Sequence, residues 1–245
     1  TDEPQAVRDE LPATERAARR IERAAHLGAT ALDLSRLRLE RLPAGLNRLN
    51  HLTHLDLRMN RLRALPTELL ELTALRELRL ERNRLQSLPD GLATLEHLET
   101  LELGFNRLAE VPAVVARLLR LRRLSLVYQK PALAQRGSAA EFSPGGKTRT
   151  ARPAGGPLRC LPDTLCRLSA LVHLDVRLNA LQALPAQIGR LRRLRELLIN
   201  NNHIGALPDS LQAAGQLRRL SAHFNRFRSL PPVLRHLHSL RILSL

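Results

Sequence analysis

The fold of this chain is decided by a string that returns at a fixed period: Leu52-x-x-Leu55-x-Leu57-x-x-Asn60-x-Leu62-x-x-Leu65-Pro66. Its first leucine recurs every 23 residues, at Leu75, Leu98 and Leu121 and again at Leu171, Leu194, Leu217 and Leu240. A fixed period of about 20–50 residues is the sequence signature of a stacked-repeat protein. We therefore expect one elongated unit instead of separate globular domains.

Each repeat has a simple physical interpretation. Leu55 and Leu57 predict a short strand in which both leucines face inward and the residue between them faces outward. No repeat can bury its leucines alone, so the strands are expected to stack in parallel as a concave sheet, with irregular or short helical turns on the convex side. An asparagine follows each strand and should bond the backbone, forming a ladder through the stack, at Asn60, Asn83, Asn106, Asn179, Asn202 and Asn225.

The departures from the period define the predicted organisation. The repeats occupy 29–245, as about eight units and a partial ninth. In the degenerate first repeat Leu37 replaces the asparagine, and Gln129 departs from the same column just before an insertion at 131–157. The insertion is rich in Pro, Gly, Ser and Ala and is predicted to be a flexible loop. Because the last repeat stops inside itself at Leu245, we expect a fragment or a neighbour at the C-terminus.

The segment 1–28 precedes the repeats. From about Pro12 to Leu27 it is rich in helix formers, and Gly28 suits the position after a helix end. Ala17, Ile21, Ala24 and Ala25 share one helical face. We expect a capping helix that covers the open N-terminal end of the core.

Composition narrows the function. The formal net charge is +16, and 37 of the 39 basic residues are arginine. No run of 18 apolar residues predicts a membrane span, and no signal peptide is evident. The two cysteines, Cys160 and Cys166, lack the partners of a zinc set or a disulfide-stapled cap, which favours an intracellular, cytoplasmic location. We find no catalytic, metal-binding or cofactor constellation, so we expect a non-enzymatic protein without a small-molecule substrate.

The repeats resemble the leucine-rich repeat superfamily from Gly28 to Leu245. The Leu-Pro-x-x-Leu ending and the 23-residue length are similar to its intracellular branch, which includes Ras-scaffold proteins, Scribble-like proteins and bacterial Roco GTPases. The segment from Ile21 to Ser35 is similar to the one that opens the repeats of bacterial Roco proteins. The resemblance implies an α/β solenoid, a curved horseshoe with a parallel concave sheet. It also implies protein recognition, with any catalysis supplied by other domains.

Two columns are predicted to form a protein-binding surface on the concave face. The column before the asparagine holds most of the few aromatic residues and the only methionine, which are candidate interface anchors. It contributes Met59, Phe105, Tyr128, Leu178 and Phe224. The column between the strand leucines is often acidic and contributes Asp56, Arg79, Glu102 and Asp175. The alternative is that some rings fold over the neighbouring repeat and extend the core.

The column after the asparagine is basic and offers a different interpretation. Its side chains recur at one repeat spacing and could follow a phosphate chain: Arg38, Arg61, Arg84, Arg107 and Lys130. Against this, the acidic column would repel phosphate and could pair with those arginines. The sequence thus leaves open a scaffold that binds a protein, a basic solenoid that docks on RNA, a ribonucleoprotein or another anionic surface, and the recognition domain of a larger GTPase or ubiquitin-ligase effector.

Overall fold

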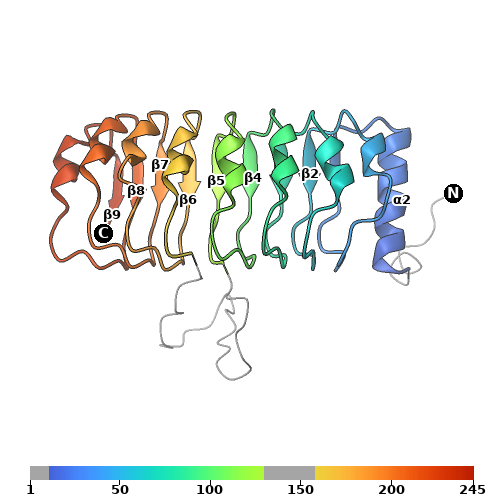
Figure 1. Cartoon of the computed structure of the whole chain (residues 1–245), viewed down its shortest axis with the longest axis horizontal. Helices are drawn as coiled ribbons and strands as arrows, with labels where there is room; N and C mark the ends of the chain where they lie inside the picture. Colours follow the sequence, from blue (N-terminus) through green and yellow to red (C-terminus); the bar gives the residue numbers. More distant parts are fainter. Residues whose placement is uncertain (1–10, 130–157) are drawn as a thin grey trace, which may run out of the picture.

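The computed structural model describes residues 11–129 and 158–245. Within them, nine three-residue strands form one parallel sheet in sequence order (Figure 1). The strands are β1 (Ala31–Asp33), β2 (His54–Asp56), β3 (Glu77–Arg79), β4 (Thr100–Glu102), β5 (Arg123–Ser125), β6 (His173–Asp175), β7 (Glu196–Leu198), β8 (Arg219–Ser221) and β9 (Ile242–Ser244). The predicted parallel stack is confirmed.

The convex side carries short 3₁₀ helices, as expected for tight return segments. Prolines such as Pro66 and Pro89 directly precede most of them, because the fixed proline φ suits a helix start. The helices are η1 (Leu46–Arg48), η2 (Thr67–Glu71), η3 (Asp90–Thr94), η4 (Ala113–Arg117), η5 (Asp163–Arg167), η6 (Ile188–Arg190), η7 (Asp209–Ala213) and η8 (Pro232–His236).

The core is a continuous column of leucines between the sheet and these helices. Leu55 and Leu57 are 1% and 0% exposed, and Leu69 and Leu72 close the convex side at 0% each. Each fully buried leucine contributes about 1.5–3 kcal/mol, and each needs the neighbouring repeats to be buried. The sheet keeps its register across the insertion, since Leu124 of β5 pairs with Leu174 of β6.

The asparagine ladder forms as predicted. Asn83 accepts the backbone N–H of Leu62 at 3.0 Å and donates to the carbonyls of Leu57 and Leu80 at 2.9 and 3.0 Å. Gln129, which departs from the column in sequence, keeps its role: it accepts from Leu108 N at 3.2 Å and donates to Leu103 O at 3.0 Å. The ladder therefore continues up to the insertion.

The predicted N-terminal helix is present as α2 (Ala13–His26) and lies beside β1 at the end of the solenoid (Figure 1). Ala17, Ile21 and Ala24 are buried in the core. Gly28 has a φ of 58°, the left-handed conformation expected after a helix end. No helix in 11–129 or 158–245 combines the length and the hydrophobicity needed to cross a membrane. The insertion at 131–157 lies outside the described residues, and the division of the chain into domains stays a prediction.

Candidate functional site

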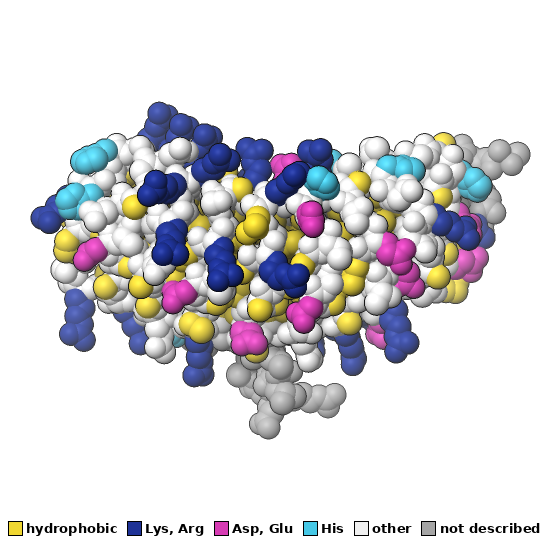
Figure 2. All heavy atoms as spheres, turned by 45° about the horizontal axis from the view of Figure 1, so that its top comes forward, with side chains coloured by type: hydrophobic (Ala, Val, Ile, Leu, Met, Phe, Trp, Pro, Cys, Tyr) yellow, Lys and Arg dark blue, Asp and Glu magenta, His cyan; other side chains and the backbone are white. Residues whose placement is uncertain are grey.

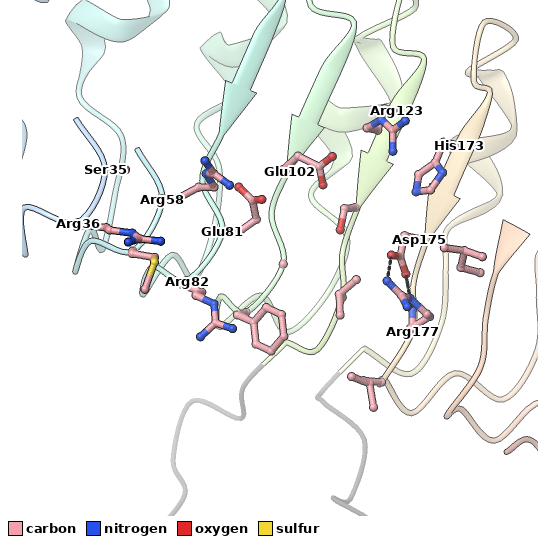
Figure 3. Close-up of a pocket in the computed structure, with 17 residues that line it drawn as sticks. Ser35, Arg36, Arg58, Glu81, Arg82, Glu102, Arg123, His173, Asp175 and Arg177 are labelled. Carbon is pink, nitrogen blue, oxygen red and sulfur yellow. Dashed lines mark hydrogen bonds and ion pairs between the residues drawn. The ribbon is translucent and has the colours of Figure 1, made fainter. Parts of the chain in front are cut away.

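The middle of the concave face is hollowed. A cavity of about 600 Å³ extends across the sheet and the segments that leave it, from the first repeat to β7. Figure 3 shows charged side chains around it, from Arg58 and Glu81 on one side to Asp175 and Arg177 on the other. Five of the predicted residues line this hollow, namely Met59, Phe105, Leu178, Glu102 and Asp175.

The floor of the hollow is made of small side chains. Ser125 and Val127 are 7% and 9% exposed. A Cβ on Gly104 would lie 3.4 Å from the Val127 carbonyl oxygen and 3.7 Å from the Ser125 hydroxyl. Gly104 thus leaves room that a side chain would occupy, and this is why the centre of the face is deep.

The Phe105 ring borders the floor, and Tyr128, which does not line the hollow itself, packs against Phe105. The centroids of Phe105 and Tyr128 lie 5.5 Å apart with a 49° angle between the ring planes, and the Arg82 guanidinium carbon lies 4.9 Å from the Phe105 centroid. Such tilted ring pairs and cation–π contacts are each mildly stabilising. Both rings are half-buried, and neither belongs to the hydrophobic core. The rings contact each other across repeats without extending the core.

The column that carries these rings has an unusual backbone. Met59, Phe105, Tyr128 and Leu178 have φ values of 57°, 59°, 45° and 57°, in the left-handed region. Backbone bonds to the next repeat hold this conformation, as from Phe105 N to Val127 O at 2.7 Å. The side chains of the column are therefore presented from a fixed backbone.

The other predicted residues of the concave face lie away from the main hollow. Asp56 and Arg79 line a second hollow of about 350 Å³ beside β1 to β3. Phe224 is 53% exposed and packs edge-on against His223, with ring centroids 5.0 Å apart. The candidate residues thus form one central group, a pair beside β1 to β3 (Asp56 and Arg79) and the separate Phe224.

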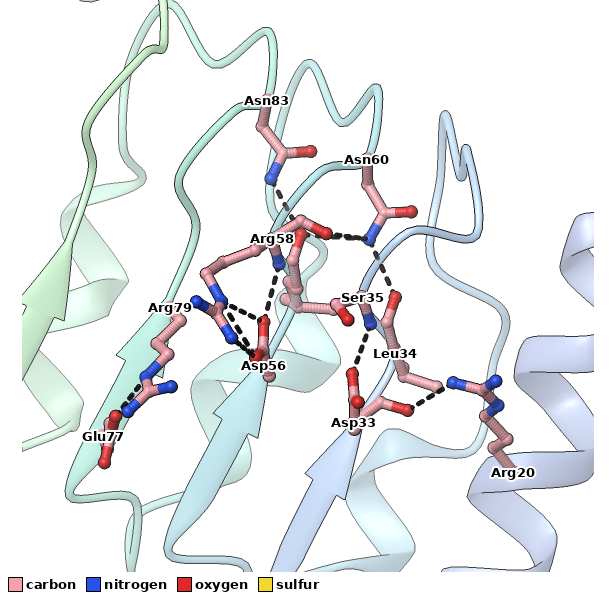
Figure 4. A network of polar contacts seen from close by, with 11 residues as sticks. Arg20, Asp33, Leu34, Ser35, Asp56, Arg58, Asn60, Glu77, Arg79 and Asn83 are labelled. Atoms are coloured by element: carbon pink, nitrogen blue, oxygen red, sulfur yellow. Dashed lines mark hydrogen bonds and ion pairs between the residues drawn. The ribbon is translucent and has the colours of Figure 1, made fainter. Parts of the chain in front are cut away.

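Charged pairs within single repeats border the hollow. The Arg58 guanidinium binds both carboxylate oxygens of Asp56, at 2.6–3.0 Å (Figure 4). Arg177 binds Asp175 in the same way, at 2.7 and 2.8 Å. Burial by itself would raise the pKa of Asp56, but hydrogen bonds from Arg58 and its positive charge lower that pKa below its usual value.

These pairs correct one expectation. The sequence suggested that the acidic column could neutralise the basic column after the asparagine. The carboxylates of Asp56 and Asp175 instead pair with Arg58 and Arg177, two residues beyond the strand ends in the same repeat. The reason is geometric, because residues two apart in an extended chain face the same side.

Two glutamates, Glu81 and Glu102, line the hollow. Burial raises the pKa of Glu81 to about 7, and the nearby negative charge of Glu102 acts in the same direction. Burial also raises the pKa of Glu102. Glu81 Oε2 is buried without a hydrogen-bond partner among the described residues. Figure 3 shows Glu81 between Arg58 and Glu102, so the hollow contains carboxyls that are easily protonated.

At the other side of the hollow, His173 Nδ1 lies 2.6 Å from Glu196 Oε2. Burial lowers the pKa of His173, and the positive charge of Arg123 lowers it further, against the opposing effect of Glu196. The imidazole is therefore biased toward its neutral form, which can donate and accept hydrogen bonds at this end of the hollow.

The basic column after the asparagine lies outside the hollow. Arg38 and Arg61 are exposed, and Arg84 and Arg107 are half-buried. Their backbone N–H groups join the ladder between repeats, as from Arg61 N to Leu39 O at 2.7 Å. Lys130, the fifth member, lies outside the described residues.

Sequence reasoning missed a whole column of the face. The missed column comes directly after the second inward-facing residue of each repeat and contributes Arg58, Glu81, Gly104, Val127 and Arg177 to the hollow. Two further lining residues, Arg123 and His173, come directly before the first strand leucine of their repeats. The alternation of an extended chain was the available signal, since positions 54, 56 and 58 must share a face. Within the described residues, no group of three His, Cys, Asp or Glu side chains could hold a metal ion.

Comparisons with known proteins agree with this geometry. The family model described as "Leucine rich repeat" matches residues 73–130. Among solved structures, internalin C2 of Listeria monocytogenes is similar over 96% of this chain and 93% of its own, with a TM-score of 0.73 and 19% identity. The protein has the leucine-rich-repeat fold. The model match and the structural neighbours support membership of the leucine-rich repeat superfamily.

Two further structures extend the comparison. A leucine-rich-repeat protein of Leptospira interrogans is 25% identical, with a TM-score of 0.62, over 91% of this chain but only 62% of its own. The ectodomain of the Arabidopsis thaliana receptor kinase GASSHO1/SCHENGEN3, solved in complex with CASPARIAN STRIP INTEGRITY FACTOR 2, is 24% identical with a TM-score of 0.59, over 90% of this chain and 28% of its own. No curated protein matches the sequence significantly. This leucine-rich-repeat chain thus spans less than two thirds of several solenoids that it resembles.

Proposed function

We propose that this leucine-rich-repeat solenoid is a non-enzymatic protein-binding module that holds a protein segment in the central hollow of its concave face. One observation carries the proposal: Phe105, which packs against Tyr128 and is flanked by Arg82, borders a deep floor of small residues. Aromatic residues and arginine beside a desolvated depression are the usual energetic centres of protein interfaces.

The hollow is prepared for binding. The ring-bearing residues have a left-handed backbone fixed by bonds to the next repeat, including Tyr128 N to Arg177 O at 3.0 Å. A preformed surface loses little conformational entropy when a partner binds, which improves affinity. An apolar side chain of the partner would enter above Gly104 and Val127, against the two rings.

The charged rim supports selectivity. Arg58 and Arg177 are already paired with Asp56 and Asp175, so they present oriented but largely neutralised groups. Such groups reject a partner that cannot replace their hydration, and so contribute more to specificity than to affinity. The further proposed contacts are Met59, Leu178, Phe224, Arg79 and Glu102.

The fold itself agrees with such a role. The GASSHO1/SCHENGEN3 ectodomain was solved in complex with another molecule, so a solenoid of this fold can serve as a binding surface. This support rests on the shared fold.

We also propose that the repeats belong to the intracellular 23-residue Leu-Pro-x-x-Leu branch and that the protein is cytoplasmic. Cys160 and Cys166 are free thiols, which suits a reducing compartment. Burial raises the pKa of Cys166 to about 11, with the charge of Asp163 contributing. Fractionation of the producing cells tests the location, and recovery of the protein outside the cytoplasm would contradict it.

The binding proposal is tested by affinity capture from the producing cells with the purified protein and with a Phe105→Ala/Tyr128→Ala variant. We expect the variant to capture much less of the partner than the unmodified protein does. Removing an interface anchor costs about 2 kcal/mol or more in binding free energy, which is roughly thirtyfold in affinity. The control is Leu27→Ala/Leu230→Ala, which removes side chains that are 70% and 68% exposed and do not line the central hollow. Equal capture by all three folded proteins would refute the concave site.

A further inference from the structure

The charge of the protein is concentrated in one part of the solenoid. Residues 11–116 contain 16 arginines and 14 acidic residues, whereas 117–129 and 158–245 together contain 17 arginines and only 4 acidic residues. Figure 2 shows many of the basic side chains gathered along the upper edge over the C-terminal repeats, on the left of the view. This edge is formed by the turns that lead into the strands, and we call it the strand-entry edge.

A notch in this edge is bordered by arginines on both sides. It has a volume of about 270 Å³ and is lined by Arg122, Ala170, Val172, Arg193, Arg195 and Gln216. Arg122 precedes β5, Val172 precedes β6 and Arg195 precedes β7. The repeat that contains β6 contributes only small side chains here, so it leaves a gap between the arginines of its two neighbours.

The backbone fixes the spacing of the notch. Val172 N donates to Arg122 O, and Arg195 N donates to Val172 O, both at 2.8 Å. Since neighbouring strands lie about 4.8 Å apart, the backbones of Arg122 and Arg195 are separated by about 10 Å. Two arginine side chains can reach one small anion from opposite sides across that distance.

The arginines of the notch are available for a ligand. Within the described residues, Arg193 and Arg195 have no ion pair. Arg122 is 3.6 Å from Glu99, but that carboxylate lies closer to Arg76, at 3.3 Å, and the Arg122 side chain is 64% exposed. Three arginines therefore line one small cavity with little internal neutralisation.

We propose that this notch binds the phosphate group of a phosphorylated serine or threonine in a protein partner. A phosphate monoester carries a charge of about −1.5 to −2 and three terminal oxygens, which suits several guanidinium groups in a small space. Gln216 adds an amide that can donate a further hydrogen bond. Arg218, whose N–H bonds Arg195 O at 2.8 Å, continues the basic edge and would favour acidic residues beside the phosphate. The inference rests on the proposed function only in that the phosphate belongs to a protein.

The geometry favours a phosphoprotein over a nucleic acid. A single strand would need aromatic side chains on which its bases could stack. The aromatic residues of the described part of the chain, Phe105, Tyr128, Phe224 and Phe227, follow the strands, whereas the notch precedes them. A phosphodiester also offers only one charge and two free oxygens, fewer than the three arginines of the notch can bind.

The experiment uses the whole chain and the labelled peptide acetyl-Gly-Ala-phosphoserine-Ala-Gly-amide, with binding measured by fluorescence anisotropy. We expect this peptide to bind about tenfold more tightly than the same peptide with serine, and Arg193→Ala/Arg195→Ala to remove about tenfold of that affinity. The matched control is Arg41→Ala/Arg63→Ala, which removes the same charge from exposed positions in the N-terminal repeats.

Each outcome has a defined meaning. Equal losses in the two arginine variants would show general electrostatic attraction and overturn the proposal, as would equal binding of the serine peptide. Tighter binding of a single-stranded oligouridylate that depends on Arg193 and Arg195 would assign the notch to nucleic acid and overturn it too. The Phe105→Ala/Tyr128→Ala variant should bind the phosphopeptide normally, so failure of the notch and failure of the concave site are separate results.

Discussion

Gln129 accepts the backbone N–H of Leu108 at 3.2 Å, the same bond that Asn106 accepts from Leu85 at 3.0 Å. Its amide also reaches Leu103 O at 3.0 Å, where Asn106 reaches Leu80 O at 2.9 Å. Glutamine is one methylene longer, yet it makes the two bonds that cross to the preceding repeats, as Asn106 does. The ladder therefore requires a side-chain amide with this reach, and it is the hydrogen bonds that are preserved.

Loss of a ladder amide should be costly. Asn106 is 0% exposed, and Asn106→Ala leaves the buried N–H of Leu85 without its acceptor. The carbonyls of Leu80 and Leu103 each lose one of their two amide donors and keep the bond from Asn83 or Gln129. We expect the free energy of unfolding to fall by about 2–3 kcal/mol, measured by urea denaturation. Gln129→Asn, which keeps an amide, should cost about 1 kcal/mol or less. A larger loss for Gln129→Asn would contradict this account.

The carboxyl of Glu81 should make stability depend on pH. Its pKa is about 7 in the folded protein against 4.5 for a free glutamate, so the folded state binds the proton more tightly. Stability should therefore fall as the pH rises from about 4.5 to 7. Glu81→Gln should remove this part of the slope and raise the free energy of unfolding at pH 8 by about 1 kcal/mol, after allowance for solvent screening.

The pH effect has a direct control. Glu110→Gln changes an exposed carboxyl and should leave the pH dependence of urea denaturation unchanged. If wild type and Glu81→Gln had parallel stability profiles between pH 4.5 and 8, burial of the Glu81 carboxyl would not be energetically significant.

The two Asp–Arg pairs should differ in strength because their burial differs. The carboxylate side chain of Asp175 is 7% exposed and that of Asp56 is 17% exposed, while both arginines are about equally open. We expect Asp175→Ala to cost about 2 kcal/mol and Asp56→Ala about 1 kcal/mol in unfolding free energy. A double-mutant cycle with Arg177→Ala isolates the interaction energy of the more buried pair. The reverse order of the two losses is the contrary result.

The convex helices are close together at Gly189. A Cβ on this residue of η6 would overlap the backbone carbonyl of Ser210 in η7, which cannot move aside as a flexible side chain can. Gly189→Ala should therefore reduce the free energy of unfolding by about 2–3 kcal/mol. Gly215→Ala, where a Cβ meets nothing within 4 Å, should change it by about 0.5 kcal/mol or less in thermal or urea denaturation. Similar stability of the two variants would rule out this close packing.

The sequence predicts much of this fold because its information is periodic. Leucines such as Leu55 and Leu78 recur with the strands and are buried as expected, and α2 ends before Gly28 as its composition indicates. The site is less predictable. The role of Gly104 depends on Val127 and Ser125 in the next repeat, and such depth cannot be inferred from one repeat alone.

The electrostatic features show the same limit. The pairing of Asp56 with Arg58 follows from strand alternation and could have been predicted. The left-handed φ of Phe105 and the notch that Val172 lines could not be predicted from the sequence, because each depends on contacts between repeats. Val172 is also 50 residues from Arg122, across the insertion, so the 23-residue period does not place them together.

The β5–β6 junction has a practical consequence. Its register and hydrogen bonds match those of the other junctions, although its paired leucines, Leu124 and Leu174, are more than twice as far apart in sequence as those of β4 and β5. The contacts that join the two sides are therefore contacts between side chains and strands, independent of the covalent link. We expect that 1–129 and 158–245 could be produced as two polypeptides and would reassociate when mixed, so the protein offers a natural starting point for a split reporter.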